Sequence, residues 1–505
     1  MNFNSLAFGL FLPLVFLLHW WLCRGRRGRQ NALLLVASYV FYGWWDWRFC
    51  GLIFATTFVS WLCARAHKQR KLWTAVSVAT SLAVLVFFKY CGFFAENLRL
   101  IFSTFGLAAD WFTVDVLLPV GISFYTFQAI SYSVDVYKGR IQPCTDLATY
   151  ALYISFFPQL VAGPIERSVD LLPQFQRARA WDYAGAVMGM RQILWGLFKK
   201  CAVADGLARF VDHAWNYTTF PDAWTCTVAV IAFALQIYGD FSGYSDIARG
   251  AARLFGIRLM DNFLTPFFSR NAIELWQRWH RSLMQWFTVY VYIPLGGSRR
   301  GNRYLHVMVV FLLSGFWHGA DWSFVLWGLL CGVWYVLTLM CGARRYKPGV
   351  DAPAGRRDLP KIVLTFAGFV AVFIFFRAFG YGQAGRMIAH IWQPGLIVIA
   401  ATLAVAWALA HIRITLLQFI AGVVLVVAIA HIAAPAPTAA FVLRNWPFVF
   451  AFALIAAEWG ARGRHFALQV MPANRALRWS IYMGLYVIVL STALNSSGDF
   501  LYFKF

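Results

Sequence analysis

The stretch LLSGFWHGADW, residues 312–322, is the most informative part of this 505-residue chain. It places His318 at the end of an apolar run and directly before a Gly-Ala-Asp break. An imidazole at membrane depth is costly unless it has a partner or a chemical role. The small residues around it allow a second backbone segment or a substrate to come close. We therefore predict that His318 takes part in chemistry.

The apolar runs on both sides of this stretch, residues 305–316 and 322–340, predict a helical hairpin with basic ends. Its tip falls near residues 318–321. The first arm is too short to cross comfortably a hydrocarbon core of about 30 Å, which needs roughly 20 residues. The tip, and His318 with it, should therefore lie within the thickness of the membrane.

Similar apolar runs recur along the whole chain, which is 61% hydrophobic and only 13% charged. A soluble domain would not carry so much apolar surface without charged breaks, so we predict an all-α polytopic membrane protein. The 24 tryptophans suit interfacial belts and aromatic-lined cavities. We expect a single domain over residues 1–505, with core motifs in 118–341 and more variable helices in 361–505.

The formal net charge of +23 comes largely from basic residues in short loops between the apolar runs. This is the positive-inside pattern of membrane proteins, and its simplest partner is anionic lipid rather than nucleic acid. The nine cysteines form no CxxC pair, and most lie in or beside apolar runs. Buried small hydrophobes explain them better than disulfides or metal ligands, so we expect no metal site.

Four polar groups interrupt the apolar pattern near helix breaks. They are FPQLVAGPIER (157–167), LQIYGDFSGYSD (235–246), LWQRWHRSL (275–283) and FWHGADW (316–322). Each has a plain structural explanation, since a histidine beside tryptophans is often only packed, and Asp240 or Asp246 could cap a helix or pair with Arg249. A purely structural bundle has little reason to keep four such costly groups, which favours a function.

The residue types limit the classes of reaction that the chain could catalyse. The chain has no GxSxG elbow of serine hydrolases and no Walker loop of NTPases. Histidine suits a general base that takes a proton from a hydroxyl attacking an acyl thioester, and indole N–H groups or cations could hold the carbonyl or phosphates of the donor. Two other functions fit the same features. A transporter or flippase of a polysaccharide precursor would also need broken helices with polar groups. A lipid acyltransferase would use similar chemistry with a longer acyl chain.

The same motifs resemble the membrane-bound O-acyltransferase (MBOAT) family, in its bacterial polysaccharide branch. That branch includes the alginate and cellulose O-acetylation proteins and the D-alanine transfer protein of teichoic acids. The resemblance covers most of the chain and is weak over residues 391–475. It rests on LPVGISFYTFQAISYSVDVYKG (118–139), FPQLVAGPIER (157–167), YGDFSGYSDIARG (238–250), WQRWHRSLMQW with YIPLGG (276–297), FWHGADWSFVLWG (316–328) and DFLYFKF (499–505).

The resemblance implies a ring of tilted helices around a thin core with a tunnel, the donor entering from the cytoplasmic side and the acceptor from the other. It implies that His318 is the general base and that His280 is the branch's second histidine, supporting the donor or the acceptor. Six further residues are expected to line the tunnel or bind substrate. They are Asp240, Tyr244, Asp246, Trp317, Trp276 and Arg278.

The function expected from this resemblance is O-acetyl transfer in a bacterial inner membrane. Acetyl-CoA or another acyl thioester would be the donor substrate, with no permanently bound cofactor. The acceptor would be an exported polysaccharide such as alginate. A periplasmic SGNH-type, esterase-like partner would complete the transfer, because the chain shows no soluble catalytic domain of its own.

Overall fold

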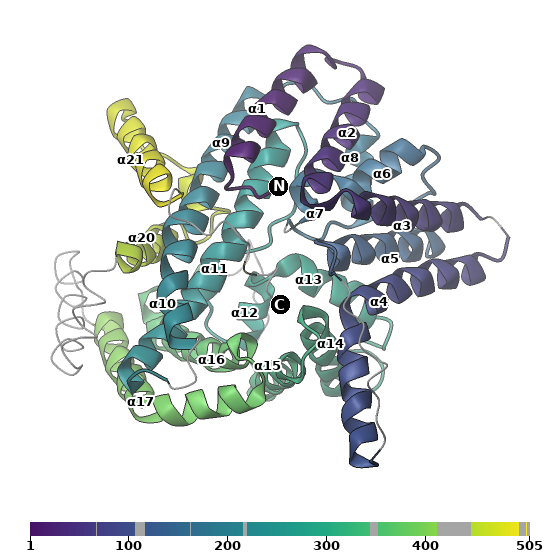
Figure 1. Ribbon diagram of the computed structural model, residues 1–505. Coiled ribbons are helices and arrows are strands. Elements are labelled where there is room, and N and C mark those ends of the chain that lie inside the picture. The colour runs from purple at the N-terminus through teal and green to yellow at the C-terminus, as the bar shows by residue number, and fades with distance from the viewer. Residues whose placement is uncertain are drawn as a thin grey trace.

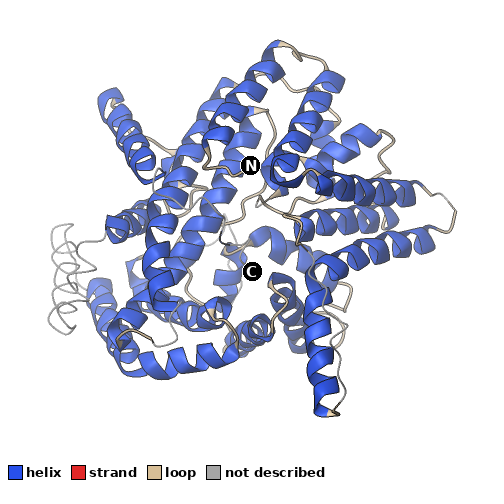
Figure 2. Cartoon of the chain, viewed as in Figure 1, coloured by secondary structure: helices blue, strands red, loops and turns tan. Residues whose placement is uncertain are grey.

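The computed structural model describes residues 1–66, 68–106, 117–161, 163–215, 220–343, 352–411, 446–493 and 501. Over these residues the chain consists of helices joined by loops and contains no strand (Figure 2). Six helical segments in this part are long and apolar enough to cross a membrane. The expected class, an all-α polytopic membrane protein, is therefore confirmed.

The N-terminal helices form one side of the molecule. They are α1 (Leu6–Trp21), α2 (Arg27–Asp46), α3 (Arg48–Arg65), α4 (Arg70–Thr104) and α5 (Ile122–Tyr137). Helices α3, α4 and α5 lie side by side (Figure 1). At 35 residues, α4 is the longest of these helices, and it reaches the tip of the later hairpin, where Tyr90 donates a hydrogen bond to the Phe316 carbonyl.

The centre of the chain is broken into shorter pieces around one long helix. The pieces are α6 (Leu147–Ser155), α7 (Phe157–Leu160), α8 (Ser168–Phe175), α9 (Tyr183–Leu197), the π-helix η2 (Phe198–Ala204), α10 (Asp205–Trp215) and α11 (Ala223–Leu254). Pro158 occupies the first turn of the four-residue α7, where it has no amide N–H to leave unpaired. Helix α11 packs along α9 and is mostly buried, so it forms the central support of the fold (Figure 1).

The region that carries the predicted site consists of short helices followed by the hairpin. Its elements are η3 (Pro266–Phe268), α12 (Ala272–Arg278), α13 (Arg281–Phe287), η4 (Thr288–Tyr292), α14 (Arg303–His318) and α15 (Trp322–Met340). Helices α14 and α15 pack against each other, and His318 is the last residue of α14. The predicted hairpin is therefore confirmed. Asp321 accepts a hydrogen bond from the Ser323 amide and so caps α15.

The C-terminal helices complete the described structure. They are η5 (Arg356–Asp358), α16 (Leu359–Arg377), α17 (Tyr381–His411), α20 (Trp446–Gly460), η6 (Ala467–Gln469) and α21 (Arg475–Ala493). Within the segment expected to be more variable, residues 412–445, 494–500 and 502–505 lie outside the described residues. Helix α16 packs on α15 and carries Phe376 toward the hairpin tip.

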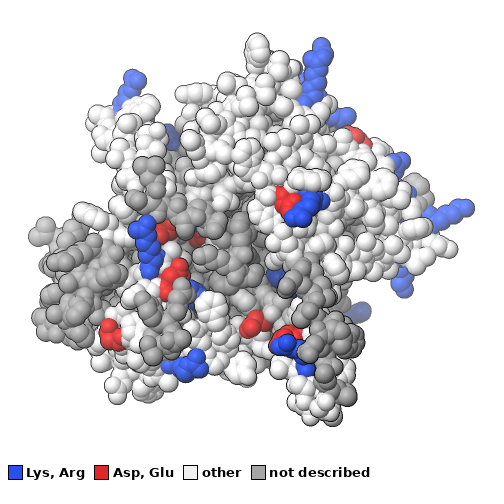
Figure 3. Space-filling view, in the orientation of Figure 1, with Lys and Arg blue, Asp and Glu red and all other residues white. Residues whose placement is uncertain are grey.

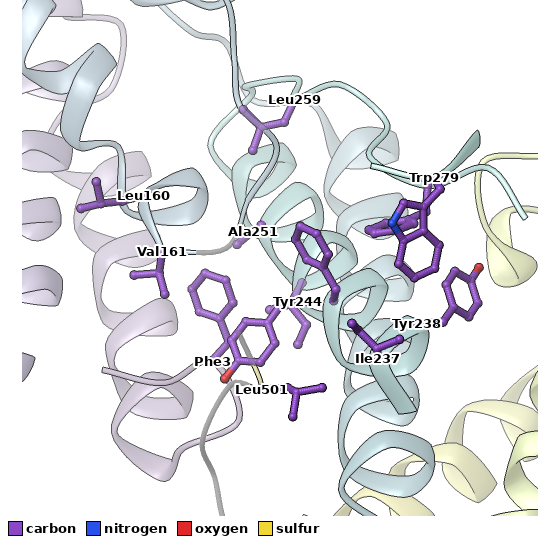
Figure 4. Packing of buried hydrophobic residues seen from close by; sticks show 14 of the residues in the cluster. Phe3, Leu160, Val161, Ile237, Tyr238, Tyr244, Ala251, Leu259, Trp279 and Leu501 are labelled. Atoms are coloured by element: carbon purple, nitrogen blue, oxygen red, sulfur yellow. The ribbon is translucent and has the colours of Figure 1, made fainter. Parts of the chain in front are cut away.

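The surface and the core both suit a protein surrounded by lipid. Large apolar side chains are exposed on many helices; Leu6, for example, is 81% exposed. The face in Figure 3 is dominated by uncharged residues, with few Lys, Arg, Asp or Glu side chains. Inside, the core is rich in aromatic rings. Phe3 packs on Tyr244 of α11 at a centroid distance of 5.5 Å, with Leu501 beside them (Figure 4).

Candidate active site at the hairpin tip

The imidazole of His318 lies at the end of α14 inside an aromatic cage and is only 5% exposed. Its ring centroid is 4.9 Å from that of Trp317, 5.0 Å from that of Trp327 and 5.3 Å from that of Phe376. These rings come from three helices, so the position of His318 depends on how α14, α15 and α16 pack. Such a water-poor surrounding strengthens any electrostatic interaction made with a reacting group.

His280, the second predicted histidine, faces the same cage. It is 2% exposed, and its ring centroid is 6.1 Å from that of His318. The chain breaks between α12 and α13 at this residue, whose φ of 44° is in the left-handed region. That conformation is uncommon for a residue with a side chain, although histidine adopts it more often than most residues do. The structure therefore brings together the two histidines, which are 38 residues apart in the sequence.

Several buried polar atoms around the histidines lack a hydrogen-bond partner among the described residues. Both ring nitrogens of His280 are in this state, as are the indole Nε1 atoms of Trp276 and Trp327. Trp276 packs on Trp327 at 5.8 Å, and Trp327 packs on His318. Native structures rarely leave buried donors unused, so this concentration indicates a place where a ligand or water supplies the missing partners.

A pocket of about 340 Å³ lies beside Trp276 and reaches Tyr335 of α15. It is lined by Leu264, Ile273, Trp276, Gln277, Arg278, Arg281, Met284, Gln285, Thr288 and Tyr335. Arg278 donates a 2.7 Å ion-pair contact to Glu274, which offsets its charge. Among the described residues, the carboxylate nearest to Arg281 is that of Asp261, at 3.9 Å, so the Arg281 cation is more available to a ligand. Of the six predicted binding residues, Trp276 and Arg278 therefore line this pocket.

The carboxylate near Arg281 is tied to the surrounding loops. Burial alone would raise the pKa of Asp261, but a 2.9 Å hydrogen bond from His465 and the charge of Arg249 together hold this pKa below its ordinary value. Asp261 therefore stays ionised at neutral pH. It fixes the loop after α11 beside the pocket rather than offering a proton donor.

The two predicted aspartates on α11 are engaged in buried ion pairs. Asp240 accepts a 2.7 Å hydrogen bond from Lys200 and a 2.9 Å bond from the Leu501 amide. Asp246 pairs with Lys199 at 2.5 Å. Both lysines belong to η2, whose π-helical turn places two successive lysines against α11. These contacts tie η2 and the C-terminal segment to the central helix.

The other two predicted residues fall in different places. Trp317 lies beside both histidines, with its ring centroid 5.9 Å from that of His280. Tyr244 is buried in the core against Phe3, and the ammonium of Lys200 lies 5.4 Å from its ring centroid. Trp317 thus belongs to the cage, whereas the contacts described for Tyr244 are with Phe3 and with Lys200 of η2.

Three residues of this region escaped the sequence prediction. Trp327 and Phe376 form walls of the cage, and Lys89 of α4 donates hydrogen bonds to the carbonyls of Trp317 and His318. A lysine inside the apolar run of α4 is a signal that sequence alone offers, because a cation there needs a partner. The two aromatic residues carry no such signal among 24 tryptophans and 48 phenylalanines.

Comparison with known proteins shows to which family the chain belongs. Residues 141–379, which include both histidines, match the family described as MBOAT, membrane-bound O-acyltransferase. The chain is 37% identical to a probable alginate O-acetylase of Pseudomonas putida over 407 residues, covering 78% of this chain and 81% of that protein. The chain belongs to the membrane-bound O-acyltransferase family. It is therefore a multi-pass membrane protein and an acyltransferase.

The names of two further relatives of this chain refer to other polymers. A peptidoglycan O-acetyltransferase of Helicobacter pylori is 34% identical, over 59% of this chain and 62% of its own length. A teichoic acid D-alanyltransferase of Bacillus subtilis is 26% identical, over 42% of this chain and 56% of its own length. All three names describe the transfer of an acyl group, acetyl or D-alanyl. The predicted family and its bacterial polysaccharide branch are confirmed.

Proposed function

We propose that this MBOAT protein takes an acetyl group from acetyl-CoA at the cytoplasmic face of a bacterial inner membrane. The group is passed through the protein for esterification of hydroxyls on an exported polysaccharide such as alginate. The observation that carries this proposal is that His318 and His280 face each other beside the buried indole N–H groups of Trp276 and Trp327, which have no hydrogen-bond partner among the described residues. Such a site can hold a polar acyl group out of water.

In this proposal His318 takes the proton of an acceptor hydroxyl as its oxygen attacks the thioester carbonyl. The new ester bond forms, the carbon–sulfur bond breaks, and the leaving thiolate receives the proton, so atoms and charge balance. A positioned general base contributes about 10²- to 10⁴-fold to such a reaction. His280 and the indole N–H groups of Trp276 and Trp327 would donate to the oxygen that gains charge.

The pocket lined by Trp276 and Arg281 is our candidate for the donor entrance. Arg281 offers a cation suited to the phosphates of a CoA thioester, while Ile273 and Met284 offer apolar walls for its uncharged arm. Trp276 forms the wall between this pocket and the histidine cage through its contact with Trp327. An acetyl group that passed this wall would reach His318.

The acceptor side of the proposal rests on the relatives. The alginate and peptidoglycan proteins named above modify polymers, which favours a polysaccharide over a membrane lipid as the final acceptor. We further propose a periplasmic partner of the SGNH esterase-like type. Its hydroxyl would be the acceptor that takes the acetyl group at the tunnel, and a hydroxyl of the polymer would then displace it, so that the polymer ester forms as the partner's ester breaks. Anionic lipids would contact the basic loops.

The test compares ester-linked acetate on exported polysaccharide from cells producing wild-type protein, His318→Ala or His306→Ala at equal membrane levels. His306 is a matched control, because it is a buried histidine of the same helix, 12 residues and about 18 Å from His318. We expect at least a 100-fold loss of acetate in His318→Ala and little change in His306→Ala. Persisting acetate in folded His318→Ala would overturn the proposal.

A further inference from the structure

The ammonium of Lys89 sits at the C-terminal end of the helix that carries His318. Its Nζ donates to the Trp317 carbonyl at 2.5 Å and to the His318 carbonyl at 3.1 Å. It also lies 5.7 Å from the centroid of the Trp317 ring. Lys89 belongs to α4, which is more than 200 residues earlier in the chain. This contact therefore joins the N-terminal helices to the catalytic hairpin.

A helix leaves its last carbonyls without partners inside the helix and concentrates negative partial charge at that end. At the end of α14 the next residues turn away, since Gly319 has an extended backbone. The Lys89 ammonium satisfies two of these carbonyls, and the Tyr90 hydroxyl satisfies a third, that of Phe316, at 2.8 Å. The end of α14 is thus held by two adjacent residues of α4.

Lys89 forms no salt bridge with a carboxylate of the described residues; the acidic residue of α4, Glu96, instead pairs with Arg99. A lysine in an apolar helix is costly unless something compensates its charge. Here the compensation is the negative end of α14, reached through charge-assisted hydrogen bonds. The charge of Lys89 and the position of His318 therefore depend on each other.

We propose that Lys89 is a positioning residue for acyl transfer, one that fixes the end of α14 so that the His318 ring stays in reach of the donor and acceptor. This inference rests on the proposed role of His318. It requires a cation at position 89, because a neutral side chain could not bind two carbonyls of a helix end with the same strength. Arginine should therefore be able to replace lysine at position 89, because it is also a cation, although its planar guanidinium binds the carbonyls in a different geometry.

The test uses the full-length protein with Lys89→Met, Lys89→Arg and, as a matched control, Lys71→Met, which makes the same change at an exposed position of the same helix. Two quantities are measured. One is amide hydrogen exchange of residues 314–318, and the other is kcat and KM with acetyl-CoA as the probe. For Lys89→Met we expect faster exchange at the end of α14 and a kcat lower by about 10- to 100-fold at a KM within about twofold, since roughly 1 Å of misplacement can cost 10²-fold.

Lys89→Arg should recover most of kcat, and Lys71→Met should match wild type in both quantities. If Lys89→Met does not fold, Lys89→Gln takes its place, since its side-chain amide keeps a hydrogen-bond donor group and removes the charge. Wild-type exchange and kcat in the neutral variant, or a raised KM at unchanged kcat, would overturn the inference. If wild-type protein does not turn over acetyl-CoA, the proposed function fails, and the exchange measurement alone still decides whether Lys89 fixes α14.

Discussion

Replacing Gly328 with alanine should separate the two helices of the hairpin that carries His318. Gly315 of α14 and Gly328 of α15 face each other where the helices cross. A Cβ atom at position 328 would lie 2.4 Å from the Phe311 carbonyl oxygen and 3.1 Å from the Gly315 Cα atom. Both contacts are with backbone, so no side chain can rotate away to make room.

Ordinary van der Waals contact begins at 3.4 Å, so the helices must move apart by about 1 Å to accept the methyl group. Overpacking of this kind costs about 1–3 kcal/mol of stability. Trp327, the residue before Gly328, packs on His318 at 5.0 Å, so the shift occurs directly at the cage. A displacement of roughly 1 Å at reacting groups can lower a rate by about 10²-fold.

The assay is ester-linked acetate per amount of folded membrane protein, with thermal unfolding in detergent measured in parallel. The matched control is Gly92→Ala, because a Cβ atom at this helical glycine of α4 would meet nothing within 4 Å. We expect a loss of activity by one to two orders of magnitude in Gly328→Ala and none in Gly92→Ala. If the two variants were equally active and equally stable, the close helix contact would not control the cage.

Two further predictions concern the ion pairs of η2 and the backbone at His280. Lys200→Met should lower the free energy of unfolding by about 3–5 kcal/mol, because the buried carboxylates of Asp205 and Asp240 lose the cation that they share. The control Arg48→Ala removes a solvent-exposed ion pair and should change the stability little. Equal unfolding temperatures for the two variants would contradict this prediction. His280→Asn should fold, because asparagine tolerates positive φ, whereas His280→Val should not fold. Gel filtration of the solubilised protein measures the folding of both variants. A well-folded valine variant would show that the left-handed backbone is not required. In the asparagine variant we expect an acetyl-transfer rate at least about tenfold lower, measured as CoA release, because the imidazole is missing from the cage.

The sequence alone determined the features that depend on neighbours along the chain. Long apolar runs predict membrane helices whatever surrounds them, because the hydrocarbon core imposes the same length and polarity on each. The hairpin of α14 and α15 and the placement of His318 at its tip followed from such runs and from the Gly-Ala-Asp break. The family also followed from sequence, since its motifs are contiguous.

Only the tertiary structure decided which side chains meet. The pairing of His280 with His318, the walls formed by Trp327 and Phe376, and the Lys89 contact all join elements far apart in the sequence. Helical periodicity gives the face on which a residue lies but not the helix that covers it. In this protein the partners were set by close helix crossings and by buried charges that each need an opposite dipole or ion, and these are properties of the packed chain as a whole.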